Sequence, residues 1–423
     1  MLFARVIRVV TGSRLDENFA MLRFQSYKFE LRPTGTQQIQ MRRIAGCCRF
    51  VFNRALAIQI ERRDQRAAPL DNAALNQQLA QWRRQPESAW LADVPAECLQ
   101  RSLRNLEGAF ARYRSSQSQY PTFKRRGRSD SFYYAKSNEV RVDQPHSRLL
   151  LPSLGWIRYR NSRAVPGRIA SITISAAGNR WFVSILTGRE VAPQVARGPA
   201  VGIDMGVVRF ATLSNGAVYT PLNSFKRHEK ALAVAQRSFS RKIKYSNNWR
   251  KERNRVQRIH IRIGNTRRDY LHKISTTISQ NHAVVCIEDL RVSDMSRSRA
   301  SNAGHTTSAA PGKRRLNKSI LDQGWFEFRR QLEYKLKWNG GRLIAVSPRN
   351  TSITCPPCRH IDKANRVSQS QFQCVACGFQ ENADLVGALN VLRAGHARLA
   401  CAETSPAYEG SGQEPTDALS QEL

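Results

Sequence analysis

The sequence has 423 residues, enough for about three domains with buried cores, and it carries 68 Lys and Arg against 32 Asp and Glu. The formal net charge of +36 indicates a polyanionic partner, for which nucleic acid is the best fit, and argues against a small-molecule substrate. No apolar run approaches the roughly twenty residues that a bilayer-spanning helix needs, so we expect no membrane partner. Arginines interrupt the first ten residues, which do not resemble a secretory signal, and this favours the cytoplasm.

The amino-terminal region divides into an unpatterned stretch and a predicted strand. Residues 1–20 show no recurring pattern, and we expect them to be a disordered extension from an early start codon. From Tyr27, apolar and charged residues alternate up to Pro33, which predicts a half-buried strand.

A long helix is predicted to follow this strand. Thr34 and Gln37 fit a capping box, and apolar residues then recur on one face with Arg49 and Arg54 among them. These arginines could bind phosphates, although a solvated amphipathic helix explains the pattern equally well. Helical pattern continues to about Tyr113.

The segment from Pro121 to Tyr134 combines basic and aromatic residues, a mixture suited to phosphate contacts and base stacking. We expect its Lys124, Arg125 and Arg126 to contact nucleic acid. Short strand-like runs follow, two of them around a turn at Gly178-Asn179, and together with the first strand they predict a small β-barrel.

The chain changes character after Gly198. The β-branched run from Val201 to Val207 contains a single acid, Asp204, which by itself could simply be a turn residue. Residues 226–273 then show a helical pattern with 16 Lys and Arg against 3 Asp and Glu, which favours contact with phosphates.

An apolar run from Ala283 to Ile287 predicts a buried parallel strand that ends at Glu288 and Asp289. Acids at such a position are costly to bury unless they are paired or bind metal. Residues 291–319 are rich in Ser, Arg, Asn and Gly and are predicted to be a mobile lid or linker. A further helix near Trp325 and a strand before the first cysteine pair complete this region.

Two Cys-x-x-Cys pairs are separated by fifteen residues, the spacing at which two thiolate turns can close one tetrahedral Zn²⁺ site. The predicted ligands are Cys355, Cys358, Cys374 and Cys377. Four unrelated buried or disulfide-paired cysteines are the alternative. The other five cysteines stand in contexts that suit reduced thiols. A predicted helix begins near Asn382 and places Asp384 in its first turn, whereas the chain after His396 is predicted to be disordered.

Three acids, Asp204, Glu288 and Asp384, stand at the ends of predicted strands and helices in apolar surroundings. In an α/β layer arrangement these ends can converge, and the resulting cluster would persist only if divalent cations neutralised it. Two Mg²⁺ ions about 3.5 to 4 Å apart would suit such ligands and could hydrolyse a phosphodiester. Asp289 is expected to be a structural acid.

Five motifs resemble, in order and spacing, the TnpB proteins, which are transposon-encoded, RNA-guided endonucleases similar to the compact type V CRISPR effectors. The motifs are GIDMG, IEDLRVSDM, DQGWFEFRRQLEYK, GGRLIAVSPRNTSITCPPC and CVACGFQENADLVGALNVL. The resemblance implies an RNase H-like (RuvC) nuclease core with catalytic, magnesium-binding Asp204, Glu288 and Asp384 and an inserted zinc ribbon. It also implies a bacterial, nucleoid-associated protein with two partners, a guide RNA from the transposon end and a double-stranded DNA target.

The resemblance also implies a division of the chain into domains. We expect a disordered extension over residues 1–20, a wedge-like β-barrel over 21–35 and 119–197, a helical recognition insert over 36–118, a RuvC-like nuclease core over 198–353 and 378–395, a zinc ribbon over 354–377 and a disordered tail over 396–423.

The chain departs from the TnpB pattern in three places. Arg359 stands where glycine is usual, Val386 replaces a common asparagine near the last acid, and residues 1–20 precede the usual start. A guided repressor that no longer cuts, and an unguided transposase or structure-selective nuclease with the same core, are the alternative readings. The intact acids argue against the repressor.

Overall fold

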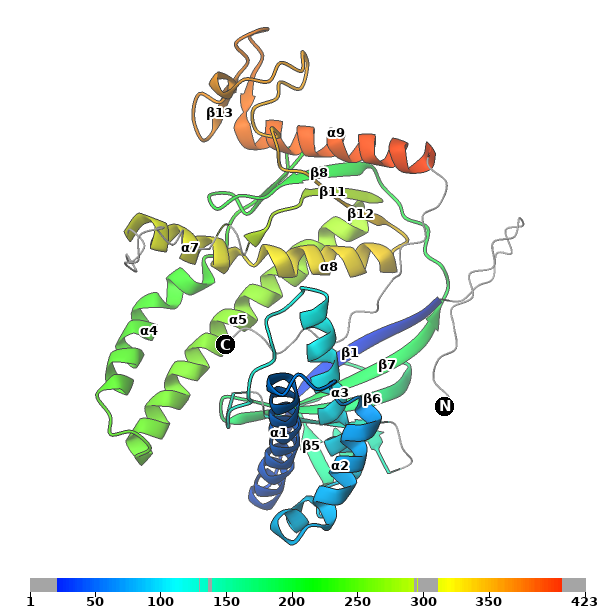
Figure 1. Ribbon diagram of the computed structural model, residues 1–423. Coiled ribbons are helices and arrows are strands. Elements are labelled where there is room, and N and C mark those ends of the chain that lie inside the picture. Colours follow the sequence, from blue (N-terminus) through cyan, green and yellow to red (C-terminus); the bar gives the residue numbers. More distant parts are fainter. Residues whose placement is uncertain (1–20, 129, 136–138, 293–294, 296–310, 405–423) are drawn as a thin grey trace, which may run out of the picture.

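The computed structural model of the chain describes residues 21–404, apart from residues 129, 136–138, 293–294 and 296–310. Figure 1 shows an amino-terminal unit of strands and helices, a second unit built on another sheet, and a small loop-rich element above helix α9. The predicted extension over residues 1–20, most of the predicted linker and the end of the tail lie outside the described residues.

Seven strands form one antiparallel sheet in the order β2-β6-β7-β1-β5-β4-β3. They are β1 Met21–Arg32, β2 Ser131–Ala135, β3 Arg141–Asp143, β4 Arg148–Leu151, β5 Gly155–Tyr159, β6 Arg168–Ala177 and β7 Arg180–Val191. The Gly178-Asn179 turn joins β6 to β7 as predicted. The edge strands β2 and β3 do not pair with each other in the described part of the chain, so closure into a barrel stays a prediction.

The helices of this unit pack on the sheet through one continuous apolar core. They are α1 Gly35–Asp64, α2 Asn72–Arg84, the 3₁₀ helix η1 Pro86–Leu91 and α3 Ala96–Arg114. The capping box at Thr34 and Gln37 is confirmed, with both of its hydrogen bonds present. Val51 of α1 and Leu103 of α3 belong to the same buried cluster as Val183 of β7.

The second unit is a five-stranded mixed sheet in the order β10-β9-β8-β11-β12. Its strands are β8 Ala200–Asp204, β9 Ala211–Leu213, β10 Val218–Tyr219, β11 Val284–Glu288 and β12 Arg342–Val346. Strands β8, β11 and β12 are parallel, whereas β9 and β10 are antiparallel to their neighbours. The prediction of a buried parallel strand before Glu288 is confirmed.

Helices cover both faces of this sheet (Figure 1). Helices α5 Asn247–Asn281, α7 Pro311–Gln323 and α8 Trp325–Trp338 lie on one side and α9 Ala383–Thr404 lies on the other, whereas α4 Ser224–Ser240 packs on α5. Helices α5 and α8 pack through Ile274, Phe328 and Leu332. Helices α4 and α5 form an arm that extends away from the sheet beside α1 (Figure 1).

Glycine allows α9 to lie directly on the sheet. A Cβ at Gly202 of β8 would lie 2.1 Å from the carbonyl oxygen of Ala388, and one at Gly395 of α9 would lie 2.1 Å from the sulfur of Cys286 in β11. Neither distance is possible for real atoms, so only glycine permits this approach.

Three sequence-based boundaries need correction. The predicted linker is helical from Pro311 onward, because α7 begins there. The tail predicted to be disordered from residue 396 is helical to Thr404, since Ala, Leu and Arg, which favour helix, continue the α9 pattern. The cysteine element includes the 3₁₀ helix η2 Lys363–Asn365 and ends with the paired strands β13 Gln371–Gln373 and β14 Gln380–Asn382, so it extends beyond residue 377.

Candidate active site and metal centre

Neighbouring parallel strands bring the first two predicted acids together. Asp204 is the last residue of β8 and Glu288 is the last residue of β11. The pairing of Ile203 with Ile287 sets both acids at the same edge of the sheet. The carboxyl ends of parallel strands are where polar sites form in open α/β sheets.

Helix α9 brings the third acid, Asp384, to the same edge. Gly387 lies one turn after Asp384 on the same face of α9, and a Cβ there would lie 3.2 Å from Cγ of Asp204. Because Gly387 has no side chain, the Asp204 carboxylate can lie against the first turn of α9. Asn382 accepts a hydrogen bond from the Asp384 backbone N–H at 3.1 Å and holds that turn in place.

Asp204 lies within the electrostatic influence of Glu288 and Asp384, and we call the three acids the carboxylate cluster. Burial, followed by the charges of Glu288 and Asp384, raises the pKa of Asp204 to about 7. Burial also raises the pKa of Glu288, while the charge of Arg366 opposes the rise at both groups. Because the two neighbouring charges disfavour the ionised form of Asp204, the site is suited to divalent cations, which would offset this repulsion.

A chain of hydrogen bonds holds Glu288, and the sequence analysis missed it. The Thr351 hydroxyl lies 2.7 Å from Oε1 of Glu288 and donates to it. The Asn390 side chain donates to the backbone oxygens of Thr351 and Thr354 at 2.8 and 2.7 Å, fixing the loop after β12 to α9. The only signal for Asn390 in the sequence is its polar side chain within an apolar stretch of the helix.

Arg209 connects the loop after β8 to the start of α9. Its Nε lies 3.7 Å from Oδ2 of Asp384, and its NH1 donates to Oδ1 of Asn382 at 3.1 Å. One guanidinium therefore contacts both the third acid and the residue that caps its turn. A cavity of about 150 Å³ lies beside Glu288, lined in part by Met205 and Trp325.

Asp289 faces a different environment from Glu288, although the two are adjacent in sequence. Its side chain is about half exposed and forms an ion pair with Arg329 of α8, and its backbone N–H donates to Val346 at 2.8 Å. These contacts agree with a structural role for Asp289.

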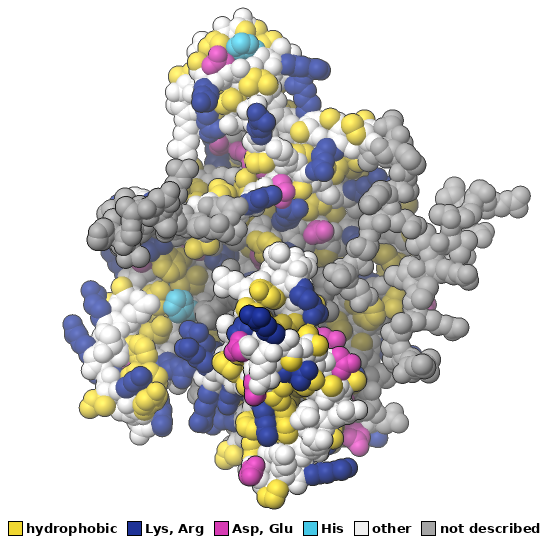
Figure 2. Space-filling model, viewed as in Figure 1, with side chains coloured by type: hydrophobic (Ala, Val, Ile, Leu, Met, Phe, Trp, Pro, Cys, Tyr) yellow, Lys and Arg dark blue, Asp and Glu magenta, His cyan; other side chains and the backbone are white. Residues whose placement is uncertain are grey.

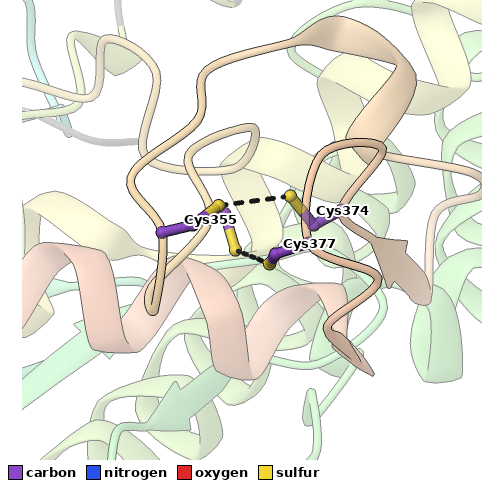
Figure 3. Close-up of side chains that lie close together, drawn as sticks. Cys355, Cys374 and Cys377 are labelled. Carbon is purple, nitrogen blue, oxygen red and sulfur yellow. Dashed lines mark hydrogen bonds between the residues drawn. The ribbon is translucent and has the colours of Figure 1, made fainter.

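The four predicted cysteine ligands converge from two turns, the first pair before η2 and the second pair between β13 and β14. Their sulfur atoms all lie within 4.8 Å of one another, with 3.6 Å between Cys355 and Cys377 and 3.5 Å between Cys358 and Cys374. Figure 3 shows Cys355, Cys374 and Cys377 pointing toward one another from two separate turns. Disulfides would need about 2.05 Å, whereas tetrahedral Zn–S bonds of about 2.3 Å place sulfurs about 3.8 Å apart. The geometry therefore suits one metal ion held by four thiolates.

The thiol of Cys374 ionises more readily than an ordinary cysteine thiol. Although burial opposes the change, hydrogen bonds from the backbone of Cys377 and Ala376 lower the pKa of Cys374 to about 6. A thiolate is the form that coordinates metal.

The chain is similar in sequence to several known proteins. Three family profiles match, described as a probable transposase over residues 183–299, a Cas12f1-like TNB domain over 325–391 and a helix-turn-helix domain over 21–67. The chain is 47% identical over 400 residues to the putative RNA-guided DNA endonuclease InsQ of Escherichia coli (strain K12), covering 94% of this chain and 99% of that protein. The chain belongs to the TnpB family.

A second relative and a solved structure are also similar to this chain, the structure in its fold alone. A putative RNA-guided DNA endonuclease of Streptomyces pristinaespiralis is 31% identical over 408 residues, covering 94% of this chain and 96% of that protein. A chain in the cryo-EM structure of the Cas12f1-sgRNA-target DNA complex has a similar fold, with a TM-score of 0.56 at 12% identity over 88% of this chain and 99% of that chain. Residues 21–67 of this TnpB chain form a strand and one long helix.

The structure gives a local role to two of the departures from the TnpB pattern, Arg359 and Val386. Arg359 adopts φ of +66°, and Gly378, its counterpart after the second cysteine pair, adopts +74°, so the same turn forms in both places. Val386 is fully buried against Phe372 and Cys374. Its side chain joins α9 to the cysteine element.

The TnpB chain uses three of the five predicted nucleic-acid contacts for internal packing. Arg49 forms an ion pair with Asp130 at 2.6 Å, Arg54 stacks over Trp82 with 4.7 Å to the ring centroid, and Lys124 lies 4.1 Å from the centroid of Phe52. Burial lowers the pKa of Lys124.

The other two predicted contacts, Arg125 and Arg126, are exposed and open to phosphates. Within the part of the chain that the structure describes, no helix is both long and apolar enough to cross a membrane.

Proposed function

We propose that this protein is an RNA-guided DNA endonuclease of a transposable element that cleaves double-stranded DNA by two-metal hydrolysis beside a short flanking motif. The observation that carries the proposal is the convergence of Asp204, Glu288 and Asp384 at one edge of the mixed sheet. Relatives named as RNA-guided DNA endonucleases, which match nearly the whole chain, support the guided activity.

We propose that the carboxylate cluster holds two Mg²⁺ ions. Asp204 is affected by the charges of both other acids, so Asp204, Glu288 and Asp384 would together hold the metal ions. When bound, the metals supply activation of a water molecule and stabilisation of the leaving 3′ oxygen. Thr351 and Asn390 hold Glu288 in place, and Arg209 holds Asp384. Arg366 adds a positive charge near the acids, suited to contact with the phosphate that is cleaved.

The cysteine element, residues 354–382, is proposed to be a zinc ribbon with one structural Zn²⁺. Four thiolates complete a tetrahedral shell and leave no position for a substrate. The shared burial of Phe372 and Val386 means that the zinc site holds the ribbon on α9, close to Asp384. Loss of metal from the purified Cys374→Ser variant, against one zinc per wild-type chain, is the expected outcome of metal analysis. Equal zinc content in both proteins would contradict the assignment.

We propose an RNase H-like (RuvC) core over residues 198–353 and 383–404, a wedge-like domain formed by the seven-stranded sheet, and a recognition insert formed by α1, α2 and α3. The strand order β10-β9-β8-β11-β12 supports the core assignment. Figure 2 shows Lys and Arg side chains gathered where the α4–α5 arm faces α1, a surface that suits guide RNA and target DNA. Pairing with the guide would select the sequence, and the protein would read the flanking motif.

One experiment tests the proposal as a whole. RNA that copurifies with the full chain is sequenced, and a DNA target that matches it is incubated with the complex in Mg²⁺ or in EDTA. We expect cleavage only in Mg²⁺ and only of the matching target. Binding without cleavage would instead support a guided repressor, whereas cleavage without any RNA would support an unguided nuclease or transposase.

A further inference from the structure

The turn at the end of the α4–α5 arm carries a compact aromatic cluster far from the carboxylate cluster. We call residues 239–249 the arm tip. The rings of Phe239 and Trp249 lie 5.0 Å apart, and those of Tyr245 and Trp249 lie 5.5 Å apart. Helix α5 begins here with Ser246, whose hydroxyl accepts a hydrogen bond from the Trp249 backbone N–H at 3.1 Å. The cap and the contacts between the tilted rings give the turn a defined shape.

Two large apolar side chains at the arm tip face solvent. Ile243 is 82% exposed and Tyr245 is 66% exposed, beside the half-buried Phe239 and Trp249. Figure 2 shows hydrophobic side chains at the surface of this end of the molecule, next to Lys and Arg. Contiguous exposure of this kind marks interaction sites on proteins.

The backbone holds the Tyr245 ring outward at an energetic cost. Tyr245 adopts φ of +69°, a left-handed conformation that residues with a bulky side chain rarely adopt. Such strain is typical of positions where the direction of a side chain has a function.

The charge around the arm tip identifies the kind of partner. Residues 237–253 contain seven Lys and Arg and a single acid, Glu252. The Lys244 ammonium lies 5.4 Å from the centroid of Tyr245, and the Arg253 guanidinium lies 5.8 Å from that of Trp249. Aromatic rings between cations match a nucleobase and its flanking phosphates. A second copy of this chain would bring like charges together and is disfavoured for that reason.

The arm tip is also continuous with the exposed arginines of the Pro121–Tyr134 segment. The side chain of Arg253 approaches Gly127 so closely that a Cβ there would lie 3.0 Å from its NH2. A basic track therefore runs from Arg125 and Arg126 past Arg253 to Trp249 and Tyr245.

From these observations we infer that the arm tip is a stacking platform for a nucleobase at an unpaired position or at the end of a duplex. Tyr245 and Ile243 cover the face of the base, and Lys242 and Lys244 contact the adjacent phosphates. The inference rests on the proposed function only in that it takes the nucleic acid bound by this protein as the partner.

The test measures binding by the full chain to three probes of the same sequence: single-stranded RNA, single-stranded DNA and a blunt DNA duplex. Tyr245→Ala should weaken binding of at least one probe roughly 5- to 100-fold, the range for loss of one stacked base. Tyr245→Phe should bind as the wild type does. The slope of log K against log salt should stay unchanged in Tyr245→Ala, because tyrosine is neutral, and should flatten by about one in Lys244→Ala. The probe that responds identifies the source of the base.

A local readout confirms where the probe binds. Ultraviolet cross-linking followed by peptide mapping should give a nucleotide adduct within residues 239–249 of the wild type and not of Tyr245→Ala. Val195→Ala, which removes an equally exposed apolar side chain away from the arm, is the matched control and should change nothing.

Three outcomes would overturn the inference. In the first, Tyr245→Ala binds all three probes as tightly as the wild type does. In the second, cross-links occur only outside the arm tip. Dissociation of a dimer by Tyr245→Ala, without a cross-link in the arm tip, would assign this surface to a second copy. The proposed function has its own test in Mg²⁺-dependent guided cleavage, which can succeed while the arm tip fails to bind a base.

Discussion

Arg359 occupies a backbone position that glycine fills in the second cysteine pair. Its φ of +66° costs a residue with a Cβ about 1–2 kcal/mol, although glycine would lose part of that advantage through the greater entropy of the unfolded chain. The turn persists because backbone hydrogen bonds tie it down, including one from the Arg359 N–H to the Cys355 oxygen at 3.0 Å.

Arg359→Gly should therefore stabilise the ribbon by about 0.5–1 kcal/mol. Zinc release as a function of chelator concentration measures this directly, with wild type and Gly378→Ala as references. We expect Arg359→Gly to need more chelator than the wild type and Gly378→Ala to need less, since the latter introduces the same strain. A ribbon that loses zinc more easily in Arg359→Gly would mean that the arginine side chain makes a compensating contact.

The roles of the acids can be separated by single substitutions. Replacing Asp204, Glu288 or Asp384 with alanine should reduce cleavage more than about a hundredfold, because direct ligands matter more than the residues that orient them. Binding of guide and target should persist, since it depends on phosphates and base pairing. Asp289→Ala should cleave within a few fold of wild type, because its carboxylate pairs with Arg329. A gel assay of binding and cleavage on one guided target compares all four variants.

The raised pKa of Asp204 also predicts how stability depends on pH when metal is absent. With a folded pKa of about 7 and an ordinary value of 3.8, Asp204 holds its proton more tightly in the folded protein. Its contribution to stability is thus complete below about pH 4 and is lost as the pH rises through about 7, by at most about 4 kcal/mol.

Urea unfolding in EDTA, at about pH 5 and about pH 7.5, should therefore show a smaller pH effect in Asp204→Asn than in wild type. Adding Mg²⁺ at the higher pH should restore stability to the wild type and not to the variant. Identical pH effects in the two proteins would show that the environment of Asp204 is more solvated than this structure indicates.

At the scale of elements, the contact between α9 and the sheet determines whether the carboxylate cluster forms. Two of its acids end parallel strands, and the third depends on how closely α9 approaches β8. Glycines at 202, 387 and 395 permit that approach, and Thr351 and Asn390 connect the loop after β12 to both Glu288 and α9. The ribbon adds Phe372 and Cys374 to the buried surface around Val386.

Two glycine-to-alanine substitutions are expected to change the free energy of unfolding in opposite directions. One lies in the contact between α9 and the sheet, and the other lies outside that contact. Gly202→Ala should destabilise the protein by about 3 kcal/mol or more, because its Cβ would meet the Ala388 backbone oxygen at 2.1 Å. Gly264→Ala, within α5 and with nothing near its added Cβ, should stabilise it by about 0.5–1 kcal/mol. Thermal unfolding of both variants gives the comparison, and equal effects would show that α9 can shift to accommodate the added methyl group.

At the scale of the whole molecule, the two units pack against each other and present their positive charge on facing surfaces. Arg23 of β1 lies 3.6 Å from the ring centroid of Trp338 in α8, and Ile261 of α5 approaches the β6–β7 turn at Gly178. This packing places the α4–α5 arm beside α1 (Figure 1), with Lys and Arg side chains gathered between them (Figure 2).

Alanine at both Arg125 and Arg126 should flatten the slope of log K against log salt by about 1.4 to 1.8, as expected for two lost phosphate contacts. Lys124→Ala is the matched control from the same segment and should leave the slope unchanged, because its ammonium packs on Phe52. Nucleic-acid binding measured over a salt series distinguishes the double variant from Lys124→Ala. A slope change confined to Lys124→Ala would reverse the assignment.

The amino-acid sequence by itself determined the features that depend on near neighbours in the chain. The spacing of the cysteine pairs, the capping box at Thr34, the Gly178-Asn179 turn and the acid that ends a buried strand at Glu288 all follow from local geometry and hydrophobic pattern. The positions of Asp204, Glu288 and Asp384 at the ends of predicted strands and helices indicated that they could converge, and the resemblance to TnpB proteins implied that they are the catalytic acids.

Only the tertiary structure decided which of these features meet and which side chains remain available. The contacts of Thr351, Asn390 and Arg209 with the acids or their loops join residues far apart in sequence, 173 positions in the case of Arg209 and Asn382, and no local pattern marks them. The same holds for Lys124, whose charge suggested a phosphate contact until its packing against Phe52 was visible. Charge and periodicity are properties of the chain, whereas burial and pairing depend on which distant segments pack together, because a side chain's partners are set by the fold.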